Sequence, residues 1–441
     1  MGLVSMALGT TTTFYVDPQG GHQVPFDSWA DAATNIQYAV NEASAGDTIR
    51  VAPGRYRRPS NAVERDGWNV VHIANKPLTL IADAGPAHTI IDGEDAHRGI
   101  MLYQTASMTT YPYRIDGFTI TGGYATHGGG IRGDASGNFT WDVELRNCIL
   151  EGNTAEQDGG GLQASFVSAN WGLTLSNTIV RGNQTLNGFG GGIKVRSHRE
   201  MRFYDCIVEY NTATNNPYVS TSQTVHEGGG LYLHRLPSVV IERTLFRGNR
   251  VSGYRTGAAV HLIQAGGSNN ADLLLRNCLF YDNVATGNQV AGAVYAMNQT
   301  GTGRFGITLE NSTIGPNTGG FLRRRFTDRT EDRVWAWNTL FFEPGLFNIP
   351  SAQRELHYCR VDEGFAYTGG NSITDLPAFV DFEGRNFRLS ADSPCINAGT
   401  NLTWTAEGLD LDRKPRRDRI FDQTDIGAYE YVYAGTILLL Q

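Results

Sequence analysis

The sequence has few lysines and no long apolar run. Lys and Arg together number 36 against 44 Asp and Glu, and only Lys76, Lys194 and Lys414 are lysines. The resulting net charge of -8 gives the molecule as a whole no electrostatic basis for binding nucleic acid. No stretch of about 18 consecutive apolar residues occurs, so we expect no membrane span.

Cysteine is scarce and odd in number, which argues against a disulfide framework. The five are Cys148, Cys206, Cys278, Cys359 and Cys395. In the repeats described below, the first three align with Thr178, Thr244 and Ser312. Free cysteine behaves as a small hydrophobic residue. We therefore predict an inward stack of small side chains, and we expect neither a metal nor another cofactor.

Glycine is abundant, with 53 residues, and short glycine-rich motifs recur along the chain. Six such motifs of the type GGGI or GAAV end at an aliphatic residue, and they recur every 29 to 38 residues. Their last residues are Ile131, Leu162, Ile193, Leu231, Val260 and Val294. A second motif of the type LRNCILEGN alternates with the first. Its last residues are Asn153, Asn183, Asn211, Asn249, Asn283 and Asn317.

Each repeat contains two or three short segments typical of strands and shows no helical period. One such unit cannot bury its own apolar face, but stacked units can, as a parallel solenoid with strands about 4.8 Å apart. Parallel crossovers are almost always right-handed. The sequence therefore predicts an all-β, single-domain right-handed parallel β-helix. We expect its asparagines to form a turn ladder, in left-handed conformation and hydrogen-bonded along the stack.

We expect the chain to divide into four segments. Residues 1–12 are interpreted as a leader remnant or an added segment, and residues 13–60 as an N-terminal strand and a capping helix. Residues 61–335 are predicted to form the β-helix coils, and residues 336–441 further coils and a cap. The helix is expected within AATNIQYAVNEASAG, residues 32–46, where it would cover the open first coil.

Segments near both ends resemble a known superfamily. SWADAATNIQYAVNEASAGDTIRVAPGRY and LTLIADAGPAHTIIDG near the N-terminus, with SPCINAGT and DIGAYEY near the C-terminus, are similar to segments of pectin-lyase-like right-handed parallel β-helix proteins. These include bacterial secreted members with a choice-of-anchor C-terminal motif. The resemblance implies a monomeric bacterial protein, secreted or located at the cell surface or in the periplasm. Where members often carry an Asp-Gly pair, this chain has DLDRKPRRD, so that pattern does not indicate a calcium site.

The strand at Ile193 predicts a polar strip on the outside of the helix. If Ile193 and Val195 point inward, then the alternating residues of the strand point outward. In the aligned repeats, one outward column consists of Arg132, Gln163, Lys194, Tyr232, His261 and Tyr295. The neighbouring column consists of Asp134, Ser165, Arg196, His234, Ile263 and Met297. The strip is short of acidic residues in an acidic chain, which favours an anionic polysaccharide as the partner.

Such a strip suits β-elimination at a uronate. The reaction requires neutralisation of the sugar carboxylate, and planar guanidinium groups at Arg196 and Arg132 could provide it. It also requires a base for the C5 proton. Lys194, which we expect to be surrounded by cations, or His234 could be that base.

The departing glycosidic oxygen needs a proton, which Tyr232 or His261 could donate. Parallel β-helix polysaccharide lyases commonly carry such basic groups on a groove face, so the resemblance supports the same interpretation. The predicted catalytic residues are Lys194, Arg196, His234, Tyr232 and His261.

Longer connections should border the strip. The segment between Asn211 and Gly228 exceeds its counterparts by about ten residues, and long insertions on a solenoid usually line the binding face. An insertion containing Trp171 could form the opposite border. The predicted substrate-binding residues are Arg132, Gln163, His198, Arg235, Tyr295, Tyr218, His226 and Trp171.

Two other functions remain open on the same fold. A glycoside hydrolase needs two carboxyl groups at the scissile bond, and the candidates Asp134, Asp158 and Glu227 fall in different coils. A non-catalytic adhesin or glycan-binding solenoid is also compatible, because the glycine and asparagine repeats resemble those of surface passenger proteins. The leading prediction is a secreted polysaccharide lyase acting on a uronate-containing polymer.

Overall fold

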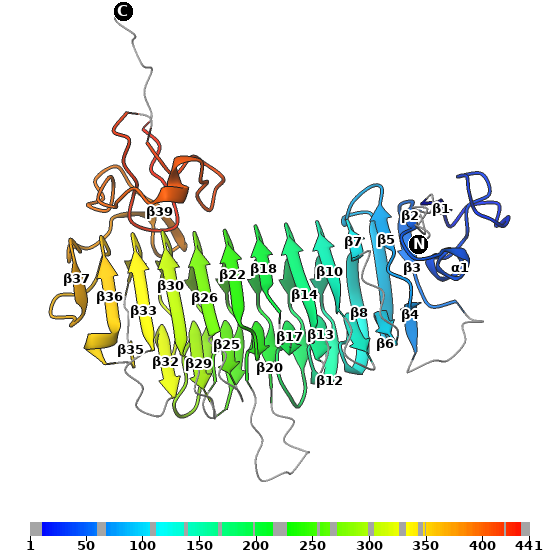
Figure 1. Cartoon of the computed structure of the whole chain (residues 1–441), viewed down its shortest axis with the longest axis horizontal. Coiled ribbons are helices and arrows are strands. Elements are labelled where there is room, and N and C mark those ends of the chain that lie inside the picture. The colour runs from blue at the N-terminus through cyan, green and yellow to red at the C-terminus, as the bar shows by residue number, and fades with distance from the viewer. Residues whose placement is uncertain are drawn as a thin grey trace, which may run out of the picture.

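The chain winds into a right-handed parallel β-helix of about nine turns, seen from the side in Figure 1. This description rests on a computed structural model. The residues it describes are 11–59, 68–105, 112–135, 140–165, 170–196, 199–214, 227–253, 256–264, 271–298, 304–325, 332–342, 347–348, 350–418 and 420–433. The predicted all-β class and the right-handed parallel β-helix are confirmed.

One face of the helix is a 13-stranded sheet, here called sheet 1. Its strands follow one another in chain order, and all neighbours pair in parallel. The strands are β1 (Thr13–Val16), β2 (Thr48–Val51), β5 (Thr79–Ala82), β7 (Tyr113–Asp116), β10 (Thr140–Arg146), β14 (Asn170–Ser176), β18 (Met201–Tyr204), β22 (Ser238–Glu242), β26 (Ala271–Arg276), β30 (Phe305–Glu310), β33 (Arg333–Trp337), β36 (Arg354–His357) and β37 (Thr368–Gly370).

The remaining faces form one 24-stranded sheet that bends around the helix. Two rows of it follow sheet 1 in each coil. They contain β3 (Gly54–Tyr56), β6 (Thr89–Gln104), β8 (Thr119–His127), β11 (Ile149–Glu151), β12 (Thr154–Asp158), β15 (Ile179–Arg181), β16 (Gln184–Thr185), β19 (Ile207–Glu209), β20 (Thr212–Ala213), β23 (Leu245–Arg247), β24 (Arg250–Ser252), β27 (Leu279–Tyr281), β28 (Val284–Thr286), β31 (Thr313–Ile314) and β34 (Leu340–Phe341).

The last row of each coil carries the residues predicted for the functional strip and is called the Lys194 row. It contains β4 (Asn69–Ala74), the end of β6, β9 (Ile131–Ala135), β13 (Leu162–Ser165), β17 (Ile193–Arg196), β21 (Leu231–His234), β25 (Val260–Gln264), β29 (Val294–Asn298), β32 (Leu322–Arg325) and β35 (Phe347–Asn348). Within this row, β9, β13, β17 and β21 each follow a Gly-Gly-Gly segment, as the sequence repeats predict.

Both ends of the helix carry additional structure. The helix α1 (Ile36–Glu42) lies at the N-terminal end, within the predicted segment, and the Asn35 side chain caps it by accepting from the Gln37 amide. At the other end, a C-terminal lobe rises beside the coils and contains the short helix η2 (Thr403–Ala406) and the hairpin of β38 (Phe379–Asp381) and β39 (Asn386–Leu389) (Figure 1). The short helix η1 (Ser351–Gln353) directly precedes β36 in the coils. The coils themselves continue to β37.

The interior is a continuous aliphatic and aromatic core. The alternating burial of β17 places Ile193 and Val195 inside. At the turn between sheet 1 and the next row, Cys148, Cys206 and Cys278 are buried and carry free thiols. The Thr and Ser residues aligned with them are also buried. Burial raises the pKa of the Cys148 thiol to about 12, which keeps it unreactive. The predicted inward stack of small side chains is confirmed.

The predicted asparagine ladder is also present; Asn153, Asn183, Asn211, Asn249 and Asn283 are completely buried, and Asn317 at its end is half-buried. Asn183 Nδ2 donates to Asn211 Oδ1 at 3.0 Å and to the Leu150 carbonyl at 2.8 Å, and the same pattern recurs in the adjacent coils. The expected left-handed conformation, however, belongs to the residue before each of the first five ladder positions, for example Gly182 with φ 59°. A glycine adopts that conformation without steric cost, so the asparagine is left to serve as the hydrogen-bonding spacer.

Candidate active site

The strands of the Lys194 row pair in the predicted register. Lys194 lies beside Gln163 on one side and Tyr232 on the other, and His261 follows Tyr232. The paired column is Arg132, Gln163, Lys194, Tyr232, His261 and Tyr295. The second paired column is Ser165, Arg196, His234, Ile263 and Met297. The predicted alignment of the two outward columns is therefore confirmed for these residues; Asp134, predicted at the start of the second column, pairs with Tyr103.

The columns are not a solvent-exposed strip, and this part of the prediction is wrong. Gln163, Tyr232, His261 and Tyr295 are all buried, although they point away from the main core. Their neighbours explain why: Tyr232 and Tyr295 form a second, smaller hydrophobic cluster with Ile263, Met297 and Ala291, and Phe189 packs against it. The ring of Phe189 stacks on that of Tyr232 with centroids 4.8 Å apart. The outside of the row thus contains a water-poor patch.

Lys194 is held by an acid rather than surrounded by cations, contrary to the prediction. Its Nζ lies 2.5 Å from Oδ2 of Asp158, and only 12% of the lysine side chain is exposed. The ammonium also lies 5.0 Å from the centre of the Phe189 ring and 5.8 Å from that of Tyr232. Nδ1 of His127 approaches the same Asp158 oxygen at 3.4 Å. The His127 hydrogen bond and the charge of Lys194 outweigh burial, so the pKa of Asp158 lies below its ordinary value.

A second carboxyl group, that of Glu227, lies on the other side of Lys194. Its Oε2 lies 3.5 Å from Nε2 of His261, and 7% of its side chain is exposed. Burial raises the pKa of Glu227 to about 8, although the charge of Lys194 opposes the shift. His261 is completely buried, and burial with the nearby His234 lowers its pKa to about 3. His261 is therefore a neutral imidazole at physiological pH.

Two arginines lie side by side next to this buried group. Burial and the charge of Arg235 both lower the pKa of Arg196, while Tyr232 opposes the shift. Arg235 adopts a left-handed conformation, with φ 61°, directly after β21. Its buried Nε has no hydrogen-bond partner among the described residues. Two guanidinium groups that repel each other form a site that an anion would stabilise.

These residues form one group, which we call the Lys194 cluster. It comprises His127, Asp158, Phe189, Lys194, Arg196, Glu227, Tyr232, His234, Arg235 and His261. Within the described parts of the chain, three or more His, Cys, Asp or Glu side chains nowhere gather as they would around a metal ion. The described helices also include none that is long and apolar enough to cross a membrane.

Comparisons with known proteins agree with the architecture. A family model described as the right handed beta helix region matches residues 98–314. The crystal structure of pectate lyase Pel9A superposes with a TM-score of 0.60 and 17% sequence identity, over 96% of this chain and 97% of that one. The chain is a right-handed parallel β-helix. At this identity, the likeness establishes the fold of the β-helix and not its chemistry.

A rhamnogalacturonan lyase is also similar, at 14% identity over 87% of this chain and 95% of that one, with a TM-score of 0.30. No curated protein matches the sequence of this β-helix.

The other predicted site residues of the β-helix have different surroundings. Arg132 forms an ion pair with Asp134 at 2.5 Å within its own strand, so its guanidinium is already neutralised. Gln163 and Tyr295 lie in the buried column on either side of the cluster. His198, Tyr218 and His226 lie outside the described residues, as does the side chain of Trp171. The substrate-binding roles of all these residues stay predictions.

The sequence alignment did not identify Asp158, Glu227 and His127 as partners of Lys194. Each of the three directly precedes a glycine-rich turn, as Phe189 does. In the β-helix these positions stack on one another, because Asp158 pairs with His127 and Phe189 pairs with Glu227. Aligning the residue before each glycine-rich turn along the repeats would have predicted that both carboxyl groups lie at one corner of the helix, rather than scattered over separate coils.

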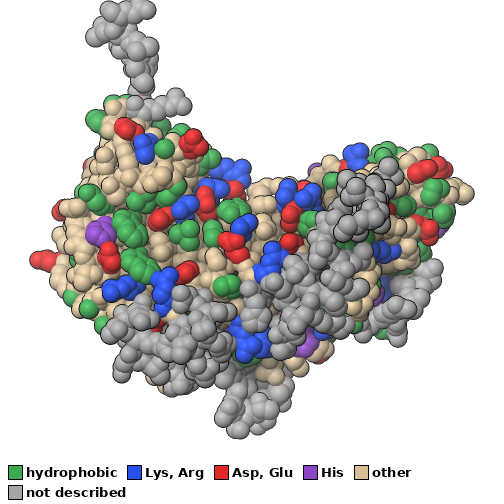
Figure 2. All heavy atoms as spheres, viewed as in Figure 1, with side chains coloured by type: hydrophobic (Ala, Val, Ile, Leu, Met, Phe, Trp, Pro, Cys, Tyr) green, Lys and Arg blue, Asp and Glu red, His purple; other side chains and the backbone are tan. Residues whose placement is uncertain are grey.

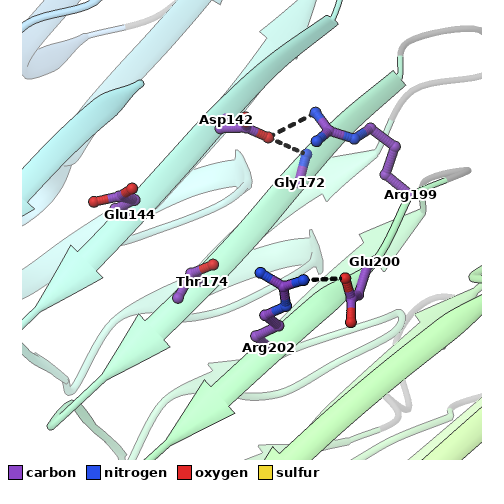
Figure 3. Close-up of a pocket in the computed structure, with 7 residues that line it drawn as sticks. All are labelled: Asp142, Glu144, Gly172, Thr174, Arg199, Glu200 and Arg202. Carbon is purple, nitrogen blue, oxygen red and sulfur yellow. Dashed lines mark hydrogen bonds and ion pairs between the residues drawn. The ribbon is translucent and has the colours of Figure 1, made fainter. Parts of the chain in front are cut away.

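Sheet 1 contains a separate hollow of about 180 Å³, shown in Figure 3. It is lined by Asp142, Glu144, Gly172, Thr174, Arg199, Glu200 and Arg202. Arg199 reaches across Gly172 to Asp142 at 2.7 Å, where any side chain on Gly172 would collide with the Asp142 carboxylate. Arg202 likewise pairs with Glu200 at 2.5 Å. Figure 2 shows similar mixing of acidic and basic side chains across this face of the molecule. Because its charges are mutually paired and largely exposed, we interpret the hollow as part of a solvated ion-pair surface.

Proposed function

We propose that this β-helix is a polysaccharide lyase that cleaves a uronate-containing polymer at the Lys194 cluster by β-elimination. The observation that carries the proposal is that Arg196 and Arg235 come from paired strands next to Lys194: Arg196 pairs with His234, Arg235 directly follows His234, and the charge of Arg235 lowers the pKa of Arg196. Repulsion between the two guanidinium groups would be relieved by a carboxylate that binds to both. A uronate carries such a carboxylate directly on C5, the carbon that loses its proton.

The first task of the site is to make the C5 proton acidic. Arg196 and Arg235 would neutralise the carboxylate, which stabilises the negative charge that develops as the proton leaves. The water-poor surroundings of Phe189 and Tyr232 strengthen this interaction, because charges attract more strongly where water is excluded. We propose that these two cations provide the neutralisation and that no metal ion is required.

The second task is removal of the proton. Lys194 is the proposed base, acting in its neutral form, and Asp158 fixes the position of its Nζ. His234, which lies beside Arg196 in the same paired column, is the alternative base. The electron pair released from the C5–H bond forms the double bond between C4 and C5, and the C4–oxygen bond breaks.

A polymer substrate also has a consequence for the cellular location of the protein. Because uronate polymers are found outside the cytoplasm, we propose that the protein is secreted or located at the cell surface or in the periplasm of a bacterium. The polymer itself would identify the habitat.

The test is product analysis on a panel of anionic and neutral polysaccharides. The expected result is ultraviolet absorbance of an unsaturated uronate product from an anionic polymer, unchanged by a chelator such as EDTA. Lys194→Ala should abolish this signal, whereas Lys414→Ala, which alters an exposed lysine in the C-terminal lobe, should not. Release of reducing ends without absorbance would contradict elimination and indicate hydrolysis. Binding without either signal would indicate an adhesin.

A further inference from the structure

Glu227 differs from the other acidic residues of the Lys194 cluster in its surroundings. Asp158 is held by Lys194 at 2.5 Å and is also approached by His127. Glu227 contacts Nε2 of His261 at 3.5 Å, and that imidazole is completely buried. The backbone of Glu227 is fixed, since its carbonyl accepts from the Gly190 amide at 2.9 Å and it pairs with Phe189. The side chain therefore sits at a defined place next to the proposed base.

The groups that face Glu227 favour its neutral form. His261 and Tyr232 are buried and carry no charge at neutral pH, and the approach of His234 further disfavours a charge on His261. Lys194 is the cation that favours ionisation, but its charge is already shared with Asp158. Burial prevails and raises the pKa of Glu227 to about 8. The carboxyl group thus retains its proton at neutral pH, whereas that of Asp158 has lost its own.

Two carboxyl groups with opposite protonation on either side of one reacting centre are the usual sign of acid and base roles. A carboxyl group that is neutral at working pH is a proton donor, and the departing glycosidic oxygen requires one. Neither residue predicted for this task is as suitable. His261 holds no ionisable proton in the relevant range, and burial raises the pKa of Tyr232 well above its ordinary value.

We infer that Glu227 is the residue that protonates the departing glycosidic oxygen, an assignment that rests on the proposed function of the Lys194 cluster. As the bond between C4 and the glycosidic oxygen breaks, the oxygen takes the carboxyl proton of Glu227. Lys194, which received the C5 proton, then holds an ammonium proton that can return to the Glu227 carboxylate. Both residues regain their starting forms, and no oxidant, reductant or further reactant is consumed.

The test compares Glu227→Gln with the wild type and with Glu209→Gln, a matched buried glutamate that pairs with Arg247 outside the cluster. On polymer, Glu227→Gln should lower kcat by about 100-fold or more with little change in KM. The fall of wild-type kcat/KM above about pH 8 should be absent from the residual activity of this variant. A uronate carrying fluoride at C4 needs no proton on its leaving group, so both enzymes should eliminate fluoride at similar rates. Glu209→Gln should retain the wild-type pH profile.

A measurement without turnover separates this inference from the proposed function. The infrared difference spectrum between the wild type and Glu227→Gln should show a protonated carboxyl group at pH 6 that disappears near pH 8. A carboxylate already present at pH 6 overturns the inference, and so does an unchanged alkaline limb in Glu227→Gln. If the wild type releases reducing ends without unsaturated products, elimination is wrong. Loss of that hydrolysis in Glu227→Gln would still support Glu227 as the proton donor. A wild type that cleaves no polymer would overturn both the proposed elimination and the role of Glu227.

Discussion

Lys194 and Asp158 form an ion pair between successive coils, with Nζ 2.5 Å from Oδ2 and only 12% and 13% of the two side chains exposed. An ion pair with so little water around it interacts more strongly than a surface pair, but each charge is also costly to leave alone. The pair therefore links the stability of this corner of the helix to the position of the proposed base.

Removing one partner should destabilise the protein more than removing both. Lys194→Met leaves the Asp158 carboxylate with His127 as its remaining partner, and we expect the free energy of unfolding to fall by about 2–3 kcal/mol. The double variant Lys194→Met with Asp158→Asn should recover most of this loss. Urea denaturation at pH 7 measures both, with the exposed Lys414→Met as the control. A change below about 0.5 kcal/mol in Lys194→Met, as is usual at exposed sites, would contradict the buried pair.

The two arginines should set the affinity for the anionic polymer. Arg196→Gln and Arg235→Gln should each weaken binding by about tenfold or more, because each removes a charge-assisted contact. The wild-type affinity should fall as salt is added, and the double variant should lose most of that dependence. Equilibrium binding at two salt concentrations tests this, with Arg181→Gln, which is exposed and pairs with Glu151, as the control. Equal salt dependence in the wild type and the double variant would exclude this pair as the anion site.

His261 should make the protein sensitive to acid. Burial depresses its pKa from about 6.5 to about 3 in the folded state. Its contribution to stability is therefore complete above about pH 6.5 and is lost as the pH falls toward 3, by up to a few kcal/mol. His261→Gln should show a smaller loss of Tm over this window than the wild type. His357→Gln, at a half-buried position near the C-terminal end, is the control, and identical pH dependence of all three proteins would refute the prediction.

The asparagine ladder should contribute strongly to stability. Asn183 accepts from the backbone and side chain of Asn153 and donates to Leu150 and Asn211, all in the buried interior. Asn183→Ala leaves several of these groups unpaired, at about 1–3 kcal/mol each, so we expect a loss of at least about 3 kcal/mol. Gln184→Ala removes an adjacent, exposed amide and should cost far less. Comparable midpoints of urea unfolding for the two variants would contradict the ladder's role.

Most of the fold could be predicted from the sequence, because the spacing of glycine-rich turns and asparagines reports directly on the coil. The same spacing gave the correct partner of Lys194 in the next coil, Tyr232. Side-chain direction in a strand alternates strictly, so the two outward columns followed from it. Those features depend on local periodicity, which a single sequence displays.

The environment of the site was harder to predict. Outward direction was equated with exposure, yet Ile263 and Met297 in the second column are apolar and cover part of the row. Asp158 ends β12 after a shift in register, and Glu227 lies just before the turn that leads to β21, so no regular alternation indicates the direction of either side chain. Their approach to Lys194 depends on how each turn folds back across the next coil, which is a tertiary feature.

The asparagine ladder also explains how this scaffold tolerates unequal connections. The step from Asn183 to Asn211 spans 28 residues and the step from Asn211 to Asn249 spans 38. Lys194 nevertheless pairs with Tyr232, because the ladder at Asn211 and the turn at Gly228 fix the register of the chain on each side of the longer connection. Connections at this corner can therefore be lengthened, shortened or exchanged while the paired strands that carry Lys194 and Tyr232 keep their register. A protein built this way can acquire a new specificity by editing one loop, without redesigning its reactive groups.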